Sequence, residues 1–195
     1  MANLQAIHSV GSSLITYLRD AYPEPLRTAH PCEFRLLSSG ELEETNDFNT
    51  TVTLYLYRVG IEEHTRNMPH NQRPQATPFP LSLCLYYLLI IWTDNALAEH
   101  TITAWVMSQL HQHPILDQST LSSTGGWDQD DQIHIVPIEM SNEDLMRLWD
   151  AMTPTYRLSL PYLARVVRID PDQVKEGRPV VATRYSYGEL KGEND

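Results

Sequence analysis

The segment Leu81–Trp92 is apolar on both faces for twelve residues, and it constrains the fold more than any other part of the chain. A run of this kind is either a central strand covered on both sides or a buried helix. Pro78 and Pro80 precede the run, and a turn signal at Asp94 and Asn95 follows it, which favours the strand. Such a strand requires a sheet with other elements packed against each side.

Several other segments carry the pattern of strands. Residues 50–59 alternate between apolar side chains on one face and threonine or tyrosine on the other, which is typical of a half-buried strand. Because Pro161 cannot donate a ladder hydrogen bond, we expect the strand that contains it to lie at an edge or at a bulge. The further predicted strands cover residues 33–37, 132–138 and 156–169, with a short one at Pro179–Tyr185.

Three helices follow from apolar spacing and end signals. The first covers Leu4–Leu18 despite Gly11, and an acidic loop is expected later, at residues 41–47. The third starts at Ser141, with acidic residues in its first turn, and runs to about residue 151. The second covers residues 96–110, and its predicted inner face consists of Leu97, Thr101, Ala104, Trp105, Val106 and Leu110.

The predicted order of elements mixes hairpin-like connections with crossovers. It indicates an α+β domain with a single mixed or antiparallel sheet flanked by helices. A chain of 195 residues is expected to build one hydrophobic core. We assign residues 1–170 to this domain and residues 171–195 to a C-terminal extension, which we expect to be partly flexible because it is charged and rich in turn residues.

The charge balance disfavours two classes of partner. The net charge of −11 opposes binding to nucleic acid or to an anionic membrane, because both would repel the chain. We find no transmembrane span, and the first residues lack the basic start and apolar stretch of a signal peptide, so we expect synthesis in the cytoplasm. Cys32 and Cys84 do not have the spacing of a disulfide framework.

A search for catalytic or cofactor chemistry yields no convincing set of residues. The sequence contains no GxSxG, Walker-type, GxGxxG or HExxH motif. His100 and His111 would be about 16 Å apart along one helix, too far for one ion, and we interpret His111 and His113 as a polar helix end. Asp128–Asp131 lacks the glycine and glutamate of a calcium loop, so we interpret it as a solvated acidic turn. We therefore expect no enzyme, no metal and no cofactor.

Aromatic residues could suggest a ligand platform, but packing is the favoured interpretation. We expect Trp149 and Tyr156 to belong to the core rather than to an interface. Strand aromatics most often pack on a sheet, and the acidic balance argues against stacked nucleic-acid bases. On this basis sheet packing is assigned to Tyr55, Tyr57, Tyr86 and Tyr87.

Three ordered stretches carry a family resemblance. The first is YLYRV at residues 55–59, leading to RNMP at 66–69. The second is PLSLCLYYLL at residues 80–89, followed by a helix that ends in LHQHPIL at 110–116. The third joins Leu148 and Trp149 to YRLSL at 156–160 and RVV at 165–167. In this order and spacing they resemble the N-terminal domain of the tail-terminator proteins of antifeeding-prophage-type contractile injection systems.

The resemblance implies a non-catalytic assembly protein. It implies a small α+β domain like that of phage tail terminators, assembled as a homo-oligomeric ring, expected to be a hexamer. Such a ring would cap the inner tube, contact the tube and sheath proteins, and stop polymerisation, within a particle assembled in the cytoplasm and then released. The alternative is a tube-completion or adaptor protein of the same particle or of a phage tail.

The long loop between residues 62 and 80 is the first candidate for a subunit or partner interface. Loops of this length are usually functional or disordered, and a flexible connector is the competing interpretation. Arg66 and Asn67 could hydrogen-bond a neighbouring subunit, Met68 could pack adaptably, and Arg73 adds a second cation.

Overall fold

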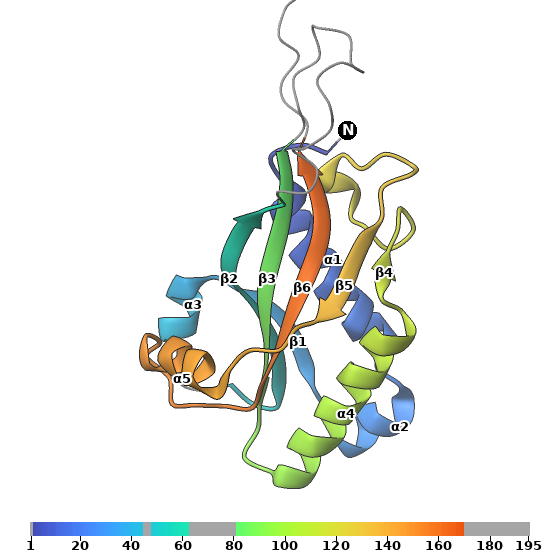
Figure 1. Cartoon of the computed structure of the whole chain (residues 1–195). Helices are drawn as coiled ribbons and strands as arrows, with labels where there is room; N and C mark the ends of the chain where they lie inside the picture. Colours follow the sequence, from blue (N-terminus) through green and yellow to red (C-terminus); the bar gives the residue numbers. More distant parts are fainter. Residues whose placement is uncertain (1, 45–47, 63–80, 170–195) are drawn as a thin grey trace, which may run out of the picture.

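The strand β3 (Leu81–Trp92) is the long apolar segment of the sequence, and it lies inside a six-stranded sheet of the order β1-β2-β3-β6-β5-β4 (Figure 1). This computed structural model describes residues 2–44, 48–62 and 81–169. β3 pairs antiparallel with β2 and β6, while β1 pairs parallel with β2, so the sheet is mixed. The other strands are β1 (Glu33–Leu37), β2 (Thr51–Ile61), β4 (Ile115–Leu116), β5 (Ile133–Pro137) and β6 (Ser159–Ile169).

Helices cover both faces of the sheet, which confirms the predicted α+β class. One face carries α1 and α4, and the other carries α3 and α5 over the end of β3 that contains Trp92 (Figure 1). The described helices are α1 (Ala6–Ala21), α2 (Glu24–Ala29), α3 (Ser39–Glu44), α4 (Ala96–Gln112), α5 (Asn142–Asp150) and the short 3₁₀ helix η3 (Ser123–Gly125).

The side chains of β3 divide between two hydrophobic clusters. Leu85, Leu89 and Ile91 join the larger cluster with α1 and α4, while Leu88 and Ile90 join the smaller cluster with α5. Alternate residues of a strand point to opposite faces, so one strand supplies both cores. This explains why the segment is apolar without alternation.

Gly11 is helical and buried, and it sets the distance between α1 and the sheet. A Cβ at this position would lie 2.9 Å from Leu36 Cδ1 and 3.3 Å from the hydroxyl of Tyr87. The absence of a side chain therefore lets α1 lie close to β1 and β3. The glycine costs some helix propensity but permits this packing.

A buried hydrogen-bond network fixes the segment 117–131 to α1. The Ser122 backbone N–H donates to Ser13 Oγ at 2.7 Å, and Ser9 Oγ donates to the Ser122 carbonyl at 3.0 Å. Trp127 Nε1 donates to Ser9 Oγ at 2.9 Å. Two serines on one helix face thus satisfy the polar groups of a loop that lies against the core.

Two predictions about individual elements need correction. β6 is an interior strand, so the edge position expected from Pro161 was wrong; the strand does have the alternative, a bulge, but between Ala164 and Val167 rather than at the proline. Pro161 is tolerated because β5 pairs no further than Tyr162, and the Pro161 carbonyl still accepts the Ile138 N–H at 3.1 Å. A loop was expected at residues 41–47, but residues 41–44 belong to the helix α3. Ser38 and Glu41 form a reciprocal capping box at the start of this helix. Residues 45–47 lie outside the described residues.

The predicted inner face of α4 was correct only in part. The buried positions are Ala98, Ile102, Val106 and Leu110, which recur at a spacing of four. Leu97 is 67% exposed and Ala104 is also exposed, while Thr101 and Trp105 are half-buried. Because α4 is apolar on nearly all sides, its pattern did not distinguish one face.

We expect Leu14→Ala to lower the free energy of unfolding by about 2–5 kcal/mol, because Leu14 is fully buried and its truncation leaves a cavity. Leu97→Ala is the matched control, since both residues are helical leucines and Leu97 is exposed; its change should stay within about 0.5 kcal/mol. Urea unfolding followed by tryptophan fluorescence measures both values. Equal losses would contradict the assignment of the core.

We expect Ser13→Ala to cost about 1–3 kcal/mol, because the Ser122 amide would lose its acceptor in a part-buried site. Ser12→Ala, one residue earlier on the half-buried side of the same helix, serves as the control and should be close to neutral. The same urea titration reports both variants, and a neutral Ser13→Ala would show that the network does not hold the segment.

Candidate interaction surfaces

The interface residues predicted from the sequence cannot be placed, because Arg66, Asn67, Met68 and Arg73 lie outside the described residues. The structure does fix the two points from which their loop departs. β2 ends at Ile61 and β3 begins at Leu81, side by side at one end of the sheet. The interface expected in this loop stays a prediction.

The exposed side of α4 is a candidate contact surface because it carries no Asp, Glu, Lys or Arg. Leu97 and Met107 are 67% and 47% exposed, and Glu99, the carboxylate within α4, is half-buried beside His100. An uncharged helix face is unusual in a chain with a net charge of −11. The exposed members of this surface are Ala96, Leu97, His100, Ala104, Met107, Ser108, His111 and Gln112.

The two outer strands of the sheet are protected in different ways. At the outer strand β1, Arg19 Nη2 donates a hydrogen bond of 2.9 Å to the Phe34 carbonyl. β4 is only two residues long, so it offers little edge for pairing. β2, however, pairs with β1 only through residues 51–55, and its remaining residues 56–61 have a described partner on the β3 side alone.

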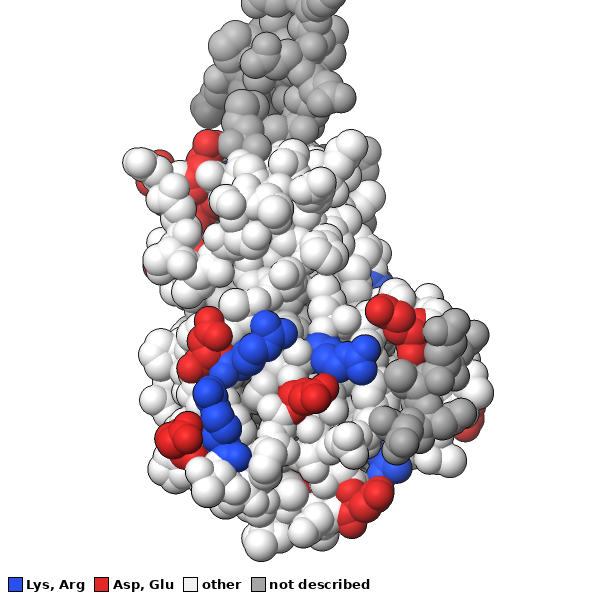
Figure 2. Space-filling model, turned by 180° about the vertical axis from the view of Figure 1, so that it is seen from behind, with Lys and Arg blue, Asp and Glu red and all other residues white. Residues whose placement is uncertain are grey.

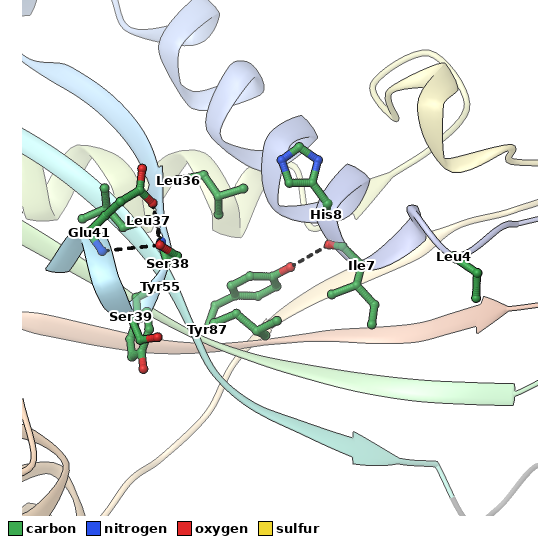
Figure 3. A pocket seen from close by; sticks show the side chains of 11 residues that line it. Leu4, Ile7, His8, Leu36, Leu37, Ser38, Ser39, Glu41, Tyr55 and Tyr87 are labelled. Carbon is green, nitrogen blue, oxygen red and sulfur yellow. Dashed lines mark hydrogen bonds between the residues drawn. The ribbon is translucent and has the colours of Figure 1, made fainter.

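A cleft of about 630 Å³ opens beside Tyr55 and Leu56 of β2, where the pairing with β1 ends (Figure 3). Ile7 and Leu36 line it from α1 and β1, and Tyr87 forms its floor with its hydroxyl 3.4 Å from the Ile7 carbonyl. Ser38 and Glu41 form a polar side at the start of α3. The cleft has an apolar floor and a short polar rim, which suits an extended peptide better than a small polar substrate.

The tyrosines divide between the two faces of the sheet. Tyr87 is buried against α1, while Tyr57 and Tyr86 lie on the α5 side with ring centroids 6.2 Å apart. The Arg58 guanidinium lies 4.8 Å from the Tyr86 ring centroid, in a cation–π contact beside a cleft of about 510 Å³ that α5 borders. The prediction of sheet packing is confirmed for these tyrosines.

Trp149 is a core residue, as the sequence predicted. Its indole N–H donates to Ser159 Oγ at 3.2 Å, and its ring packs edge-on against Trp92. Tyr156 contacts the same indole with ring centroids 5.6 Å apart but remains 46% exposed. The prediction of a core position is therefore confirmed for Trp149 and wrong for Tyr156, which contacts the smaller cluster from the exposed surface.

The described residues bring together no group of three His, Cys, Asp or Glu side chains that could hold a metal ion. His113 contacts Tyr17 with ring centroids 6.0 Å apart and lies 3.4 Å from Gln109 Nε2, so it takes part in the α1–α4 contact. The Asp128 backbone N–H donates to Asp131 Oδ2 at 2.8 Å, which closes the predicted acidic turn.

Charged side chains are mixed rather than segregated on the face that carries α1. Figure 2 shows Lys and Arg interspersed with Asp and Glu over the lower half of this face, and few charges over much of the upper half. A phosphate backbone would find no continuous basic stripe here among the described residues. None of the described helices is both long enough and apolar enough to cross a membrane.

Both cysteines are held as neutral thiols. Burial raises the pKa of Cys32 to about 12. Burial, and then the hydrogen bond from Cys84 Sγ to Glu62 Oε2 at 3.0 Å, raises the pKa of Cys84 to about 11. Because the thiolate is the nucleophile, neither cysteine is suited to covalent catalysis at neutral pH.

We expect iodoacetamide to alkylate both thiols slowly at pH 8, with rates rising about tenfold per pH unit up to about pH 11 as thiolate forms. The Cys32→Ser and Cys84→Ser variants separate the two rates, and glutathione provides an unperturbed reference. A rate that levels off near pH 8.5 would contradict the raised pKa values.

Comparisons with known proteins identify both a family and a fold. The sequence model of the Pvc16 N-terminal domain matches residues 9–183. The "PVC sheath/tube terminator in extended state" of an extracellular contractile injection system is similar in structure, with a TM-score of 0.57, 18% identity and 96% of this chain covered. The anti-feeding prophage cap, a tube-terminating cap, gives a TM-score of 0.56, 16% identity and the same 96% coverage.

The match covers only part of those two proteins. This chain spans 65% of the PVC terminator and 62% of the anti-feeding prophage cap. At these identities the likeness establishes the fold. No curated protein matches the chain at a significant level.

Proposed function

Because the chain belongs to the Pvc16 N-terminal domain family, we propose that it is a non-catalytic terminator that closes the inner tube and sheath of a contractile injection particle. The observation that carries this proposal is the structural likeness to two terminators over 96% of the chain. Both of those proteins end a tube, and one of them is a terminator of both sheath and tube. The proposed partners are therefore tube and sheath proteins.

A terminator acts by geometry rather than by chemistry. It must bind the last ring of a polymer through one surface and offer no equivalent surface to the next ring. The described residues suit this role because their exposed features are a helix face, strand ends and clefts, and no group of three His, Cys, Asp or Glu among them could hold a metal ion. The two thiols, held neutral by their raised pKa values, are consistent with a role that needs no nucleophile.

We further propose that the chain assembles as a homo-oligomeric ring, with six subunits as the expected number. A closed ring requires a heterologous interface, in which one surface of each subunit meets a different surface of the next. The uncharged outer side of α4 supplies one such surface. The loop with Arg66 and Arg73 is the proposed contact to a neighbour or to the tube.

The charge of the chain limits the other partners. At a net charge of −11, neither nucleic acid nor an anionic membrane would gain the counterion release or attraction that drives such binding. We also propose that the particle is assembled in the cytoplasm, with the finished particle as the site of function.

Deleting the gene in a particle-producing strain tests the proposal. We expect tubes of abnormal and widely varied length, or tubes without a stable sheath, because nothing would stop polymerisation. Electron microscopy of purified particles measures the length distribution. Particles of normal, narrow length with intact sheath would contradict the terminator role.

The deletion strain can be complemented with variants of the chain, and two exposed methionines provide a matched pair of positions for this experiment. Met107 lies on the outer side of α4 and Met146 on α5, with exposures of 47% and 43%. Met107→Arg should reduce ring formation and fail to restore normal length, because it buries an unpaired charge in the proposed interface. Met146→Arg should complement as well as the unchanged chain. Light scattering after size-exclusion chromatography reports the oligomeric state of each variant.

A further inference from the structure

The second half of β2 is an unfinished sheet edge. β1 stops pairing at Tyr55, so residues 56–61 have a described neighbour only in β3 (Figure 1). A free strand edge presents unpaired backbone groups and is a template for another strand. At the other end of the sheet, the outer strand β4 is only two residues long, so it presents little edge to another strand.

The backbone of this edge points in a defined direction. The Glu62 N–H donates to the Ser82 carbonyl at 2.9 Å, toward β3. Backbone groups alternate in direction along an antiparallel strand, so those of Ile61 and Val59 point away from β3. The edge therefore offers two donors and two acceptors to an added strand.

Apolar side chains accompany these backbone groups, which have no partner among the described residues. Val59 and Ile61 are 46% and 60% exposed, on the same face as their cross-strand neighbours Leu85 and Leu83, which are buried. The cleft in Figure 3 lies further along β2, at Tyr55 and Leu56, near the end of β1. An added strand would cover both isolated side chains and extend along the cleft.

We propose that residues 179–185 of the same chain form this strand, antiparallel to β2, and complete the sheet as its seventh strand. These residues lie outside the described part of the structure. Their sequence, PVVATRY, contains β-branched and aromatic residues that favour strands. The proline at the start is tolerated at the first position of an edge strand.

The direction of the chain supports this occupant. β2 and β6 both pair antiparallel with β3, so they run parallel and finish at the same end of the sheet. The chain leaves β6 at Ile169, at the end where β2 finishes with Ile61. A segment that turns back from there along β2 must run antiparallel to it.

The connection is long enough. Three strand spacings separate β6 from the outer side of β2, which is about 14 Å. The nine residues 170–178 can span up to about 30 Å when extended. Gly177 supplies a turn residue just before the proposed strand.

The length of the family match also favours a strand supplied by the same domain. The Pvc16 N-terminal domain pattern continues to residue 183, well beyond the end of β6 at Ile169. Most of the proposed strand thus lies inside the family domain. A strand that completes the sheet accounts for a domain boundary at this position.

Disulfide scanning tests the proposal in the full-length chain. In a Cys32→Ser, Cys84→Ser background, Val59→Cys is combined with one further cysteine in the segment, followed by mild oxidation of dilute protein. Peptide mass spectrometry then identifies each crosslink. The scanned positions are Val180, Val181, Ala182, Thr183 and Arg184.

We expect crosslinks within one chain at alternate positions, because only side chains on the same face as Val59 come within disulfide range. Equal crosslinking at all five positions would overturn the proposal, since it indicates an unpaired segment. Crosslinked dimers as the main product would also overturn it, by showing that a second copy supplies the strand. The absence of any crosslink would do the same.

Hydrogen exchange provides an independent measurement. Val181→Pro and Ala182→Pro each remove one backbone donor, and one of the two must face β2. We expect the amides of Val59 and Ile61 to exchange at least about tenfold faster in one or both variants. Glu176→Pro, in the connection, is the control and should leave their exchange unchanged. Identical exchange at these two amides in all three variants and the unchanged chain would overturn the proposal.

Discussion

The two-sided burial of β3 is the constraint on which the rest of the structure depends. Leu85, Leu89 and Ile91 form the floor of the α1–α4 core, while Leu88 and Ile90 lie under α5. A strand covered on both faces fixes the layers, because helices must lie on each side of the sheet. Surfaces for other proteins are then left at strand edges, on the outer sides of helices and in loops.

The sequence predicted the sheet because its strongest signals were local. The apolar run after Pro80, the alternation at 50–59 and the helix start at Ser141 each depend on neighbours in the chain. The inner side of α4 could not be chosen in this way, because Leu97 and Ile102 are equally apolar and only the position of the sheet decides which is buried. α3 could have been found from Ser38 and Glu41, whose spacing is that of a capping box.

The candidate surfaces were harder to predict, because they depend on how segments distant in the sequence are placed next to one another. No pattern within residues 50–61 shows that β1 ends opposite Tyr55 and leaves Val59 and Ile61 without a described neighbour on the outer side of β2. That edge arises from the unequal lengths of two strands that a helix separates in sequence. The resemblance to tail terminators came from ordered stretches instead, and the family match and the fold now agree with it.

The central claim, that this chain ends a tube, is tested most directly by locating it in the particle. An epitope tag at the C-terminus, gold-labelled and viewed by electron microscopy, gives the position of the chain along the tube. The account predicts label at one end only, opposite the baseplate, in nearly every particle. Label along the length of the tube, or at the baseplate, would contradict it.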